Sequence, residues 1–156
     1  MTQIQNPIRK KDDKLFFEVE LNWLSGSEGE LGAREVEQRI HVATPKVFGG
    51  DEDQWSPEHL FLGAISSCFM TTYLFFSAKY GFHISAYECN IIGDVEMVDG
   101  KYKFTHINIF PKVYVADEPT AAKARLAMQK TQGYCLISNS VNAQITYHTE
   151  VLTENS

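Results

Sequence analysis

The sequence predicts an α+β fold in which antiparallel β-hairpins pack around two central helices, in the order ββ-α-ββ-α-β. Three observations lead to this prediction. Two segments, residues 57–80 and 118–131, carry helix start and stop signals, and alternating apolar residues typical of strands surround them. The dipeptide Asp99-Gly100, which favours a tight hairpin turn, separates two long alternating runs. We expect a polar N-terminal arm over residues 1–14 and a single α+β domain over residues 15–156.

The first two predicted strands form a hairpin. Residues 15–23 place alternate apolar side chains on one face, which indicates a half-buried strand. Residues 24–32 are rich in glycine and serine and predict a loose turn, and residues 35–44 form the second strand. Pro45 and the paired glycines that follow predict a connecting loop over residues 45–55.

The first helix is predicted between Ser56 and Gly81. Ser56 suits the N-cap, Pro57 the first helical position, and Glu58 complements the positive end of the helix dipole, while Gly81 fits a helix terminator. The run from residue 60 to residue 78 has no charged side chain and is long enough to cross a bilayer. Six hydroxyl-bearing residues interrupt this run, and acidic residues precede it without a basic flank, so a buried central helix is favoured over a membrane span.

The second half of the chain is also predicted to contain a hairpin followed by a helix. Residues 84–115 form two long strands around Asp99-Gly100, and Asp117 caps a second helix that Gly133 is expected to end. Residues 135–142 form a short segment with helical character, and residues 143–152 form the last strand.

Composition and charge exclude several functions. The net charge of −6 disfavours nucleic acid and anionic membranes as partners. The first 14 residues contain no apolar signal segment, so a cytoplasmic location is expected. The five histidines are dispersed, which predicts no metal site. Three cysteines without C-x-x-C spacing are too few for a disulfide scaffold, and they indicate either redox chemistry or core packing.

Cys68 and Cys135 are the candidate redox pair. Cys68 lies in the middle of the first predicted helix and Cys135 just after the second, so two adjacent central helices can bring them together across 67 residues of sequence. Such a pair suits a peroxidase, in which one thiolate attacks a peroxide and the second thiol resolves the sulfenic acid to a disulfide. A buried cysteine is, however, also a common small core residue.

The thiolate requires a counter-charge, because burial raises the pKa of a cysteine. Cys68 is about three turns into its helix, too far for the helix dipole to help, so an arginine held by a carboxylate is expected. Glu58 is the candidate carboxylate. It precedes Cys68 by ten residues, which is about 15 Å along a helix and on a different face, so a second copy of the chain in a homodimer would have to supply it.

These residues resemble the OsmC/Ohr family of thiol-dependent peroxidases. The segment "SPEHLFLGAISSCFMTT" is similar to the family motif (N/S)-P-E-x-L with a cysteine ten residues after the glutamate, and matches Glu58 and Cys68. The downstream "YCLISNSV" matches the second cysteine, Cys135, with Ser138 and Asn139 in its surroundings. The resemblance covers residues from about 15 to 150.

The resemblance implies an intertwined homodimer with two active sites at its interface. It implies reduction of organic hydroperoxides without a bound cofactor, and recycling by an external dithiol of the dihydrolipoyl type. The catalytic residues that it implies are Cys68 as the peroxidatic cysteine, Cys135 as the resolving cysteine, Glu58, and an arginine from the N-terminal hairpin.

The arginine is where the sequence departs from the family pattern. In the better-known members it follows a glycine pair in the first hairpin loop, where this chain has Glu28. Arg34 is the expected replacement and Arg39 the second choice. The departure keeps a different function in view, namely a carrier of hydrophobic ligands or a redox sensor with the same fold.

Overall fold

The computed structural model describes residues 9–11 and 14–154, which divide into two compact units at Leu60 and Phe61. The N-terminal unit comprises residues 1–60 and the C-terminal unit residues 61–156. Strands β1 (Arg9–Lys11) and β2 (Lys14–Phe16) pair antiparallel. Most of the predicted polar arm, residues 1–8 and 12–13, lies outside the described residues, and the single domain over 15–156 stays a prediction.

Three antiparallel strands form the sheet of the N-terminal unit: β3 (Glu20–Ser25), β4 (Glu28–Ala33) and β5 (Val36–Ala43). The predicted loose turn over residues 24–32 is therefore wrong, since most of it forms β4. The glycines that suggested a turn serve close packing instead. A Cβ on Gly32 would overlap the guanidinium of Arg39, and a Cβ on Gly29 would crowd the Leu21 side chain.

The first helix, α1 (Pro57–Tyr80), begins as predicted. Ser56 Oγ accepts a hydrogen bond from the His59 backbone N–H at 3.2 Å, and the Ser56 N–H donates to His59 Nδ1 at 3.3 Å. This reciprocal pair has the form of a capping box, with histidine in place of the usual glutamate. By length and apolar composition α1 also meets the requirements of a membrane span, as core helices of soluble proteins do.

Helix α1 ends at Gly81, as predicted. Gly81 has φ +67°, and the N–H groups of Gly81 and Phe82 donate to the carbonyls of Ala78 and Ser77 at 3.2 and 3.1 Å. These two bonds form a Schellman motif, which favours glycine because its φ lies in the left-handed region.

The sheet of the C-terminal unit contains β6 (Ala86–Val98), β7 (Lys101–Val115), β8 (Gln144–Tyr147) and β9 (Glu150–Thr153). Strands β6 and β7 form the predicted hairpin around Asp99 and Gly100, which both have positive φ. The predicted last strand over residues 143–152 divides into β8 and β9, and both pair parallel to β7. The α+β class is confirmed, although the last connection is parallel and not a hairpin.

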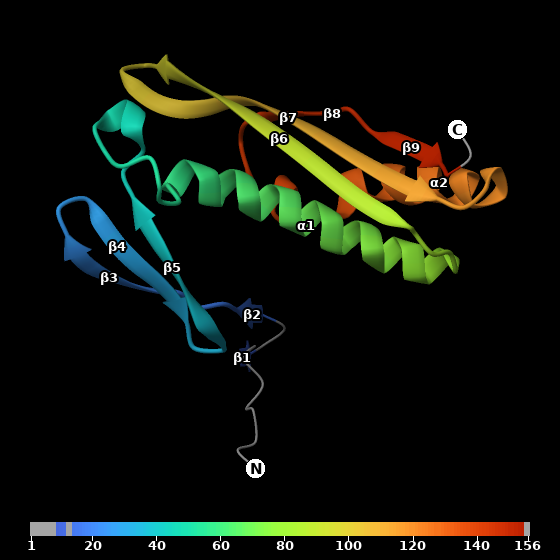
Figure 1. Ribbon diagram of the computed structural model, residues 1–156, viewed down its shortest axis with the longest axis horizontal. Coiled ribbons are helices and arrows are strands. Elements are labelled where there is room, and N and C mark those ends of the chain that lie inside the picture. Colours follow the sequence, from blue (N-terminus) through green and yellow to red (C-terminus); the bar gives the residue numbers. More distant parts are fainter. Residues whose placement is uncertain (1–8, 12–13, 155–156) are drawn as a thin grey trace, which may run out of the picture. The chain divides into compact units, whose positions relative to one another are not determined.

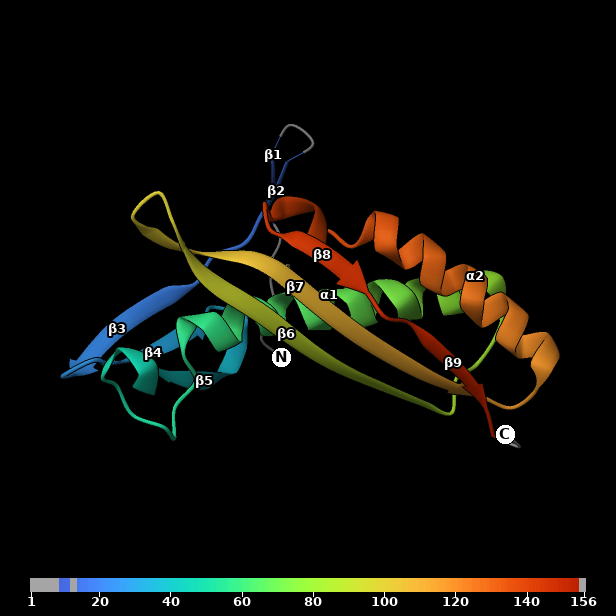
Figure 2. The same ribbon diagram turned by 90° about the horizontal axis from the view of Figure 1, so that it is seen from above.

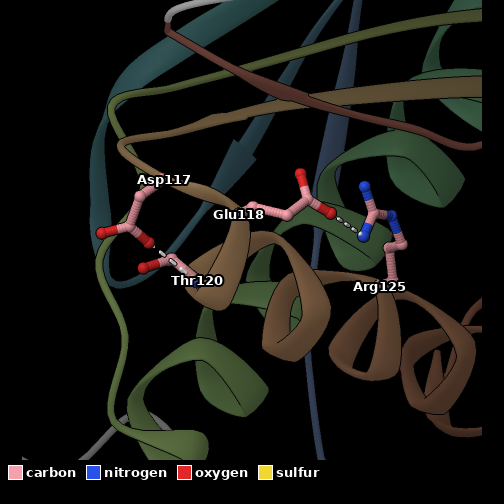
Figure 3. A network of polar contacts seen from close by, with 4 residues as sticks. All are labelled: Asp117, Glu118, Thr120 and Arg125. Carbon is pink, nitrogen blue, oxygen red and sulfur yellow. Dashed lines mark hydrogen bonds and ion pairs between the residues drawn. The ribbon is translucent and has the colours of Figure 1, made fainter.

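Helix α2 (Glu118–Tyr134) starts at the predicted cap. Asp117 Oδ1 accepts from the Thr120 backbone N–H at 2.9 Å, and Glu118 pairs with Arg125 at 2.8 Å on the exposed side (Figure 3). Gly133 does not end α2 as expected, because the helix continues through it to Tyr134.

Both helices cover the same face of the C-terminal sheet (Figures 1 and 2). The core contains a stripe of α1 side chains spaced three or four residues apart, small residues of α2 and the inward residues of β7. Its fully buried members include Ile65, Phe69, Tyr73, Ile107, Ile109, Val113, Val115, Ala121, Ala124, Ala127 and Cys135. The short helices are η1 (Lys46–Phe48) in the N-terminal unit and η2 (Ser138–Ser140) in the C-terminal unit.

Candidate active site

Cys68 and Cys135 come together in the C-terminal unit. Cys68 is partly buried on α1, one residue before Phe69 in the core stripe, and Cys135 is fully buried at the C-cap of α2. The two side chains are neighbours, since the Cys135 thiol is among the groups that lower the pKa of Cys68. Both are free thiols in the structure.

A tight turn after α2 holds Cys135. The N–H of Asn139 donates to the Cys135 carbonyl at 3.0 Å, and Asn139 Nδ2 donates to the carbonyl of Gly133 at 3.1 Å. The hydroxyl of Ser138, which is itself buried, donates to Cys135 Sγ at 3.1 Å. This turn fixes the direction of the Cys135 side chain and presents the backbone of residues 136 and 137 to Cys68.

The electrostatics of Cys68 favour its thiolate. Burial raises the pKa of the Cys68 thiol, but hydrogen bonds to the sulfur outweigh burial, and the pKa lies below its usual value. The donors, in order of effect, are the backbone of Ile137, the thiol of Cys135, the hydroxyl of Thr72 and the backbone of Leu136. Thr72 is one helical turn from Cys68, with Oγ1 4.0 Å from Sγ. The turn after α2 therefore supplies three of the four donors.

The other two thiols are less acidic. Burial raises the pKa of Cys135, and hydrogen bonds from Ser138 offset only part of this rise. Burial also raises the pKa of Cys89 on β6, against weaker contributions from Tyr87 and Ser66. Cys68 is thus the one cysteine of the three whose thiolate the surroundings stabilise.

An aromatic hollow begins beside Thr72. It has a volume of about 350 Å³ and is lined by Thr71, Thr72, Phe75, Phe76 and Tyr134. Phe76 and Tyr134 join α1 to the end of α2 with ring centroids 5.5 Å apart. Thr72 lines the hollow and its hydroxyl lies 4.0 Å from Cys68 Sγ, so it connects the hollow to the cysteine.

Glu58 and the two candidate arginines belong to the N-terminal unit. Glu58 Oε2 is buried and has no hydrogen-bond partner among the described residues. Arg39 crosses Gly32 and pairs with Glu20 at 2.5 Å, so its guanidinium is already engaged. Arg34 is exposed in the turn between β4 and β5. Glu58 and Cys68 share one continuous helix, ten residues apart, and the structure does not bring them together.

Apart from Cys135, sequence reasoning missed the groups that act directly on Cys68. Backbone donors such as those of residues 136 and 137 leave no signature in a sequence. Thr72 did leave one, because residues four apart on a helix are neighbours. Among residues 9–11 and 14–154, no group of three or more His, Cys, Asp or Glu side chains is placed to hold a metal ion.

Comparisons with known proteins agree with this fold. The family described as OsmC-like protein matches residues 49–150. An OsmC-like protein of unknown function from Vibrio cholerae has a TM-score of 0.77 at 20% identity, covering 86% of this chain and 98% of that one. An organic hydroperoxide resistance protein from Elizabethkingia anophelis has a TM-score of 0.71 at 16% identity, covering 92% and 100%.

One relative is similar to this chain in sequence over most of its length. The uncharacterized protein YmaD of Bacillus subtilis is 22% identical over 138 residues, which cover 86% of this chain and 91% of YmaD. The family match includes both Cys68 and Cys135 and spans more than half of the chain. The resemblance drawn from the two cysteine motifs is confirmed, and the chain belongs to the OsmC-like protein family.

Proposed function

We propose that the protein is a cysteine-based peroxidase that reduces organic hydroperoxides to alcohols, with Cys68 as the nucleophile and Cys135 as the resolving thiol. The observation that carries the proposal is the environment of Cys68, where hydrogen bonds favour the thiolate beside a second thiol. The family contains members named organic hydroperoxide resistance proteins, including ones from Elizabethkingia anophelis and Legionella pneumophila.

The proposed reaction has three balanced steps. The Cys68 thiolate attacks the terminal peroxide oxygen, the O–O bond breaks, and the alkoxide takes up a proton and leaves as the alcohol, so that Cys68 becomes a sulfenic acid. The Cys135 thiol then attacks the sulfenic sulfur, forming the Cys68–Cys135 disulfide and releasing water. An external dithiol, of the dihydrolipoyl type, reduces this disulfide by exchange and becomes a disulfide itself.

The aromatic hollow supports an organic substrate. Its lining of Phe75, Phe76 and Tyr134 suits the apolar part of a hydroperoxide, and its border at Thr72 would place the peroxide group near Cys68. Hydrogen peroxide has no group to fill this space. We therefore expect organic hydroperoxides to react with Cys68 faster than hydrogen peroxide.

The proposal includes a homodimer in which Glu58 orients an activating arginine, Arg34, that stabilises the leaving alkoxide. Two observations support it. The buried oxygen of Glu58 lacks a partner among the described residues, which is costly unless another group satisfies it. On α1, Leu74 and Phe75 are 40% and 62% exposed, an apolar surface that a second copy would cover. Because Arg39 is paired with Glu20, Arg34 is the better candidate.

The test is a free-thiol count before and after one equivalent of cumene hydroperoxide. The wild type should lose two thiols, Cys68→Ser should lose none, and Cys135→Ser should lose one and accumulate a sulfenic acid that dimedone traps. Cys89→Ala is the matched control and should still lose two. If the wild type keeps all three thiols, the proposal fails, and a carrier of hydrophobic ligands in the same hollow becomes the function to pursue.

A further inference from the structure

The hydroxyl of Ser138 makes a contact that the proposed reaction leaves unexplained. It donates to Cys135 Sγ at 3.1 Å from a position that is only 8% exposed. Ser138 opens η2, three residues after Cys135, and the turn between them is closed by backbone hydrogen bonds. A buried hydroxyl has many possible acceptors, and a neutral sulfur is a weak one. The contact gains strength when the sulfur becomes a thiolate.

Tyr147 of β8 is a second group that interacts with Ser138. Burial raises the pKa of the Tyr147 phenol, and the Ser138 hydroxyl offsets part of this rise. The Tyr147 ring stacks on Phe69 with centroids 5.5 Å apart, which holds Tyr147 in place. The Ser138 hydroxyl directs its own proton toward Cys135 Sγ.

We propose that Ser138, supported by Tyr147, is a positioning residue for the resolving step: it holds Cys135 Sγ toward Cys68 and stabilises the Cys135 thiolate that attacks the sulfenic acid. This inference rests on the proposed peroxidase function. The step is balanced, because the thiol proton of Cys135 and the hydroxyl of the Cys68 sulfenic acid leave together as water while the S–S bond forms.

The resolving step is where such help is needed. Burial disfavours the Cys135 thiolate, and no cation from the described part of the chain acts on its sulfur. Ser138 is the largest favourable influence on that thiolate. Ser138 is not itself a donor to Cys68, so loss of its hydroxyl should slow the second step more than the first.

The experiment compares Ser138→Ala with Ser140→Ala. Ser140 lies in the same η2 helix, and its hydroxyl donates to the carbonyl of Leu136 at 2.9 Å. After one equivalent of cumene hydroperoxide, sulfenic acid formation is followed by dimedone trapping and disulfide formation by thiol count. In Ser138→Ala, disulfide formation should slow roughly tenfold at neutral pH, the size expected for a lost hydrogen bond to a charged group, while sulfenic acid formation should slow clearly less.

Two further measurements separate positioning from general damage. Raising the pH should restore the rate of Ser138→Ala, because Cys135 then ionises without help. Tyr147→Phe keeps the ring on Phe69 and should slow disulfide formation less than Ser138→Ala does. Equal slowing of both chemical steps, or equal effects of Ser138→Ala and Ser140→Ala, would overturn the inference.

A direct titration makes the test independent of peroxide chemistry. In a Cys68→Ser, Cys89→Ala background, the thiolate absorbance near 240 nm reports Cys135 alone. Adding Ser138→Ala should move the midpoint to higher pH, and an unchanged midpoint would overturn the inference. If wild type forms no disulfide while this midpoint does move, the proposed function fails and the assigned role of Ser138 at the Cys135 thiolate stands.

Discussion

Replacing Cys135 tests whether its thiol activates Cys68 within one chain. Cys135→Ala removes one donor to Cys68 Sγ, whereas Cys135→Ser keeps an O–H donor at the same place. A typical hydrogen bond contributes roughly 0.5–1.5 kcal/mol net, and about 1.4 kcal/mol is a factor of ten. Because burial continues to oppose ionisation, the pKa of Cys68 should rise in Cys135→Ala, and its alkylation at neutral pH should slow roughly two- to tenfold.

The assay is the rate of iodoacetamide alkylation at Cys68, followed by peptide mass across the pH range. Cys135→Ser should react at close to the wild-type rate, and Cys89→Ala, which removes a thiol that does not act on Cys68, should match the wild type. A Cys135→Ala variant that alkylates as fast as the wild type would refute the reasoning. The backbone donors of residues 136 and 137 would then account for the lowered pKa of Cys68 without the second thiol.

Three further predictions concern stability and are read by urea denaturation. Gly81→Ala should destabilise the protein by about 1 kcal/mol because the φ of Gly81 is +67°. Gly133→Ala should stabilise it by roughly 0.4–1 kcal/mol, because Gly133 lies inside α2 with open space where the Cβ would be. Two changes in unfolding free energy of the same sign would contradict this prediction. Phe69→Ala, at a fully buried site, should cost roughly 3–5 kcal/mol, and a cost under about 1 kcal/mol would show that the core collapses around it. Hydrogen bonds from the side chain and backbone of Thr120 hold the pKa of Asp117 below its usual value, so the stability that this carboxylate adds should be lost as the pH falls below about 4. Asp117→Asn, which keeps a cap acceptor, should lack that acid-dependent loss.

The helices and the long hairpin could be predicted because their signals are local. Capping residues at Ser56 and Asp117, and positive φ at Gly81 and Asp99-Gly100, each act within a few residues. Strand β4 could not be predicted in the same way. The glycines within it look like turn residues, and their role depends on Arg39, which reaches across Gly32 to Glu20 from a strand that folds back later.

The candidate site was likewise predicted only in part from the sequence. The sequence suggested that Cys68 and Cys135 meet, because each lies on or next to one of two helices that are expected to be adjacent in the core. It also suggested an arginine held by Glu58 as the activator of Cys68, because a charged side chain can be identified from its residue type alone. Two of the four donors to Cys68 are backbone groups, whose identity does not depend on the side chains at positions 136 and 137.

The position of Cys68 in the middle of α1 explains why those backbone donors matter. A cysteine at a helix N-terminus gains from unpaired N–H groups and the dipole, whereas in the middle of a helix every nearby N–H is already bonded to a carbonyl. The turn after α2 brings N–H groups from elsewhere in the chain to the same sulfur, and it carries Cys135 with them. In the proposed reaction, one segment, residues 135–137, would therefore both activate the first thiol and supply the second.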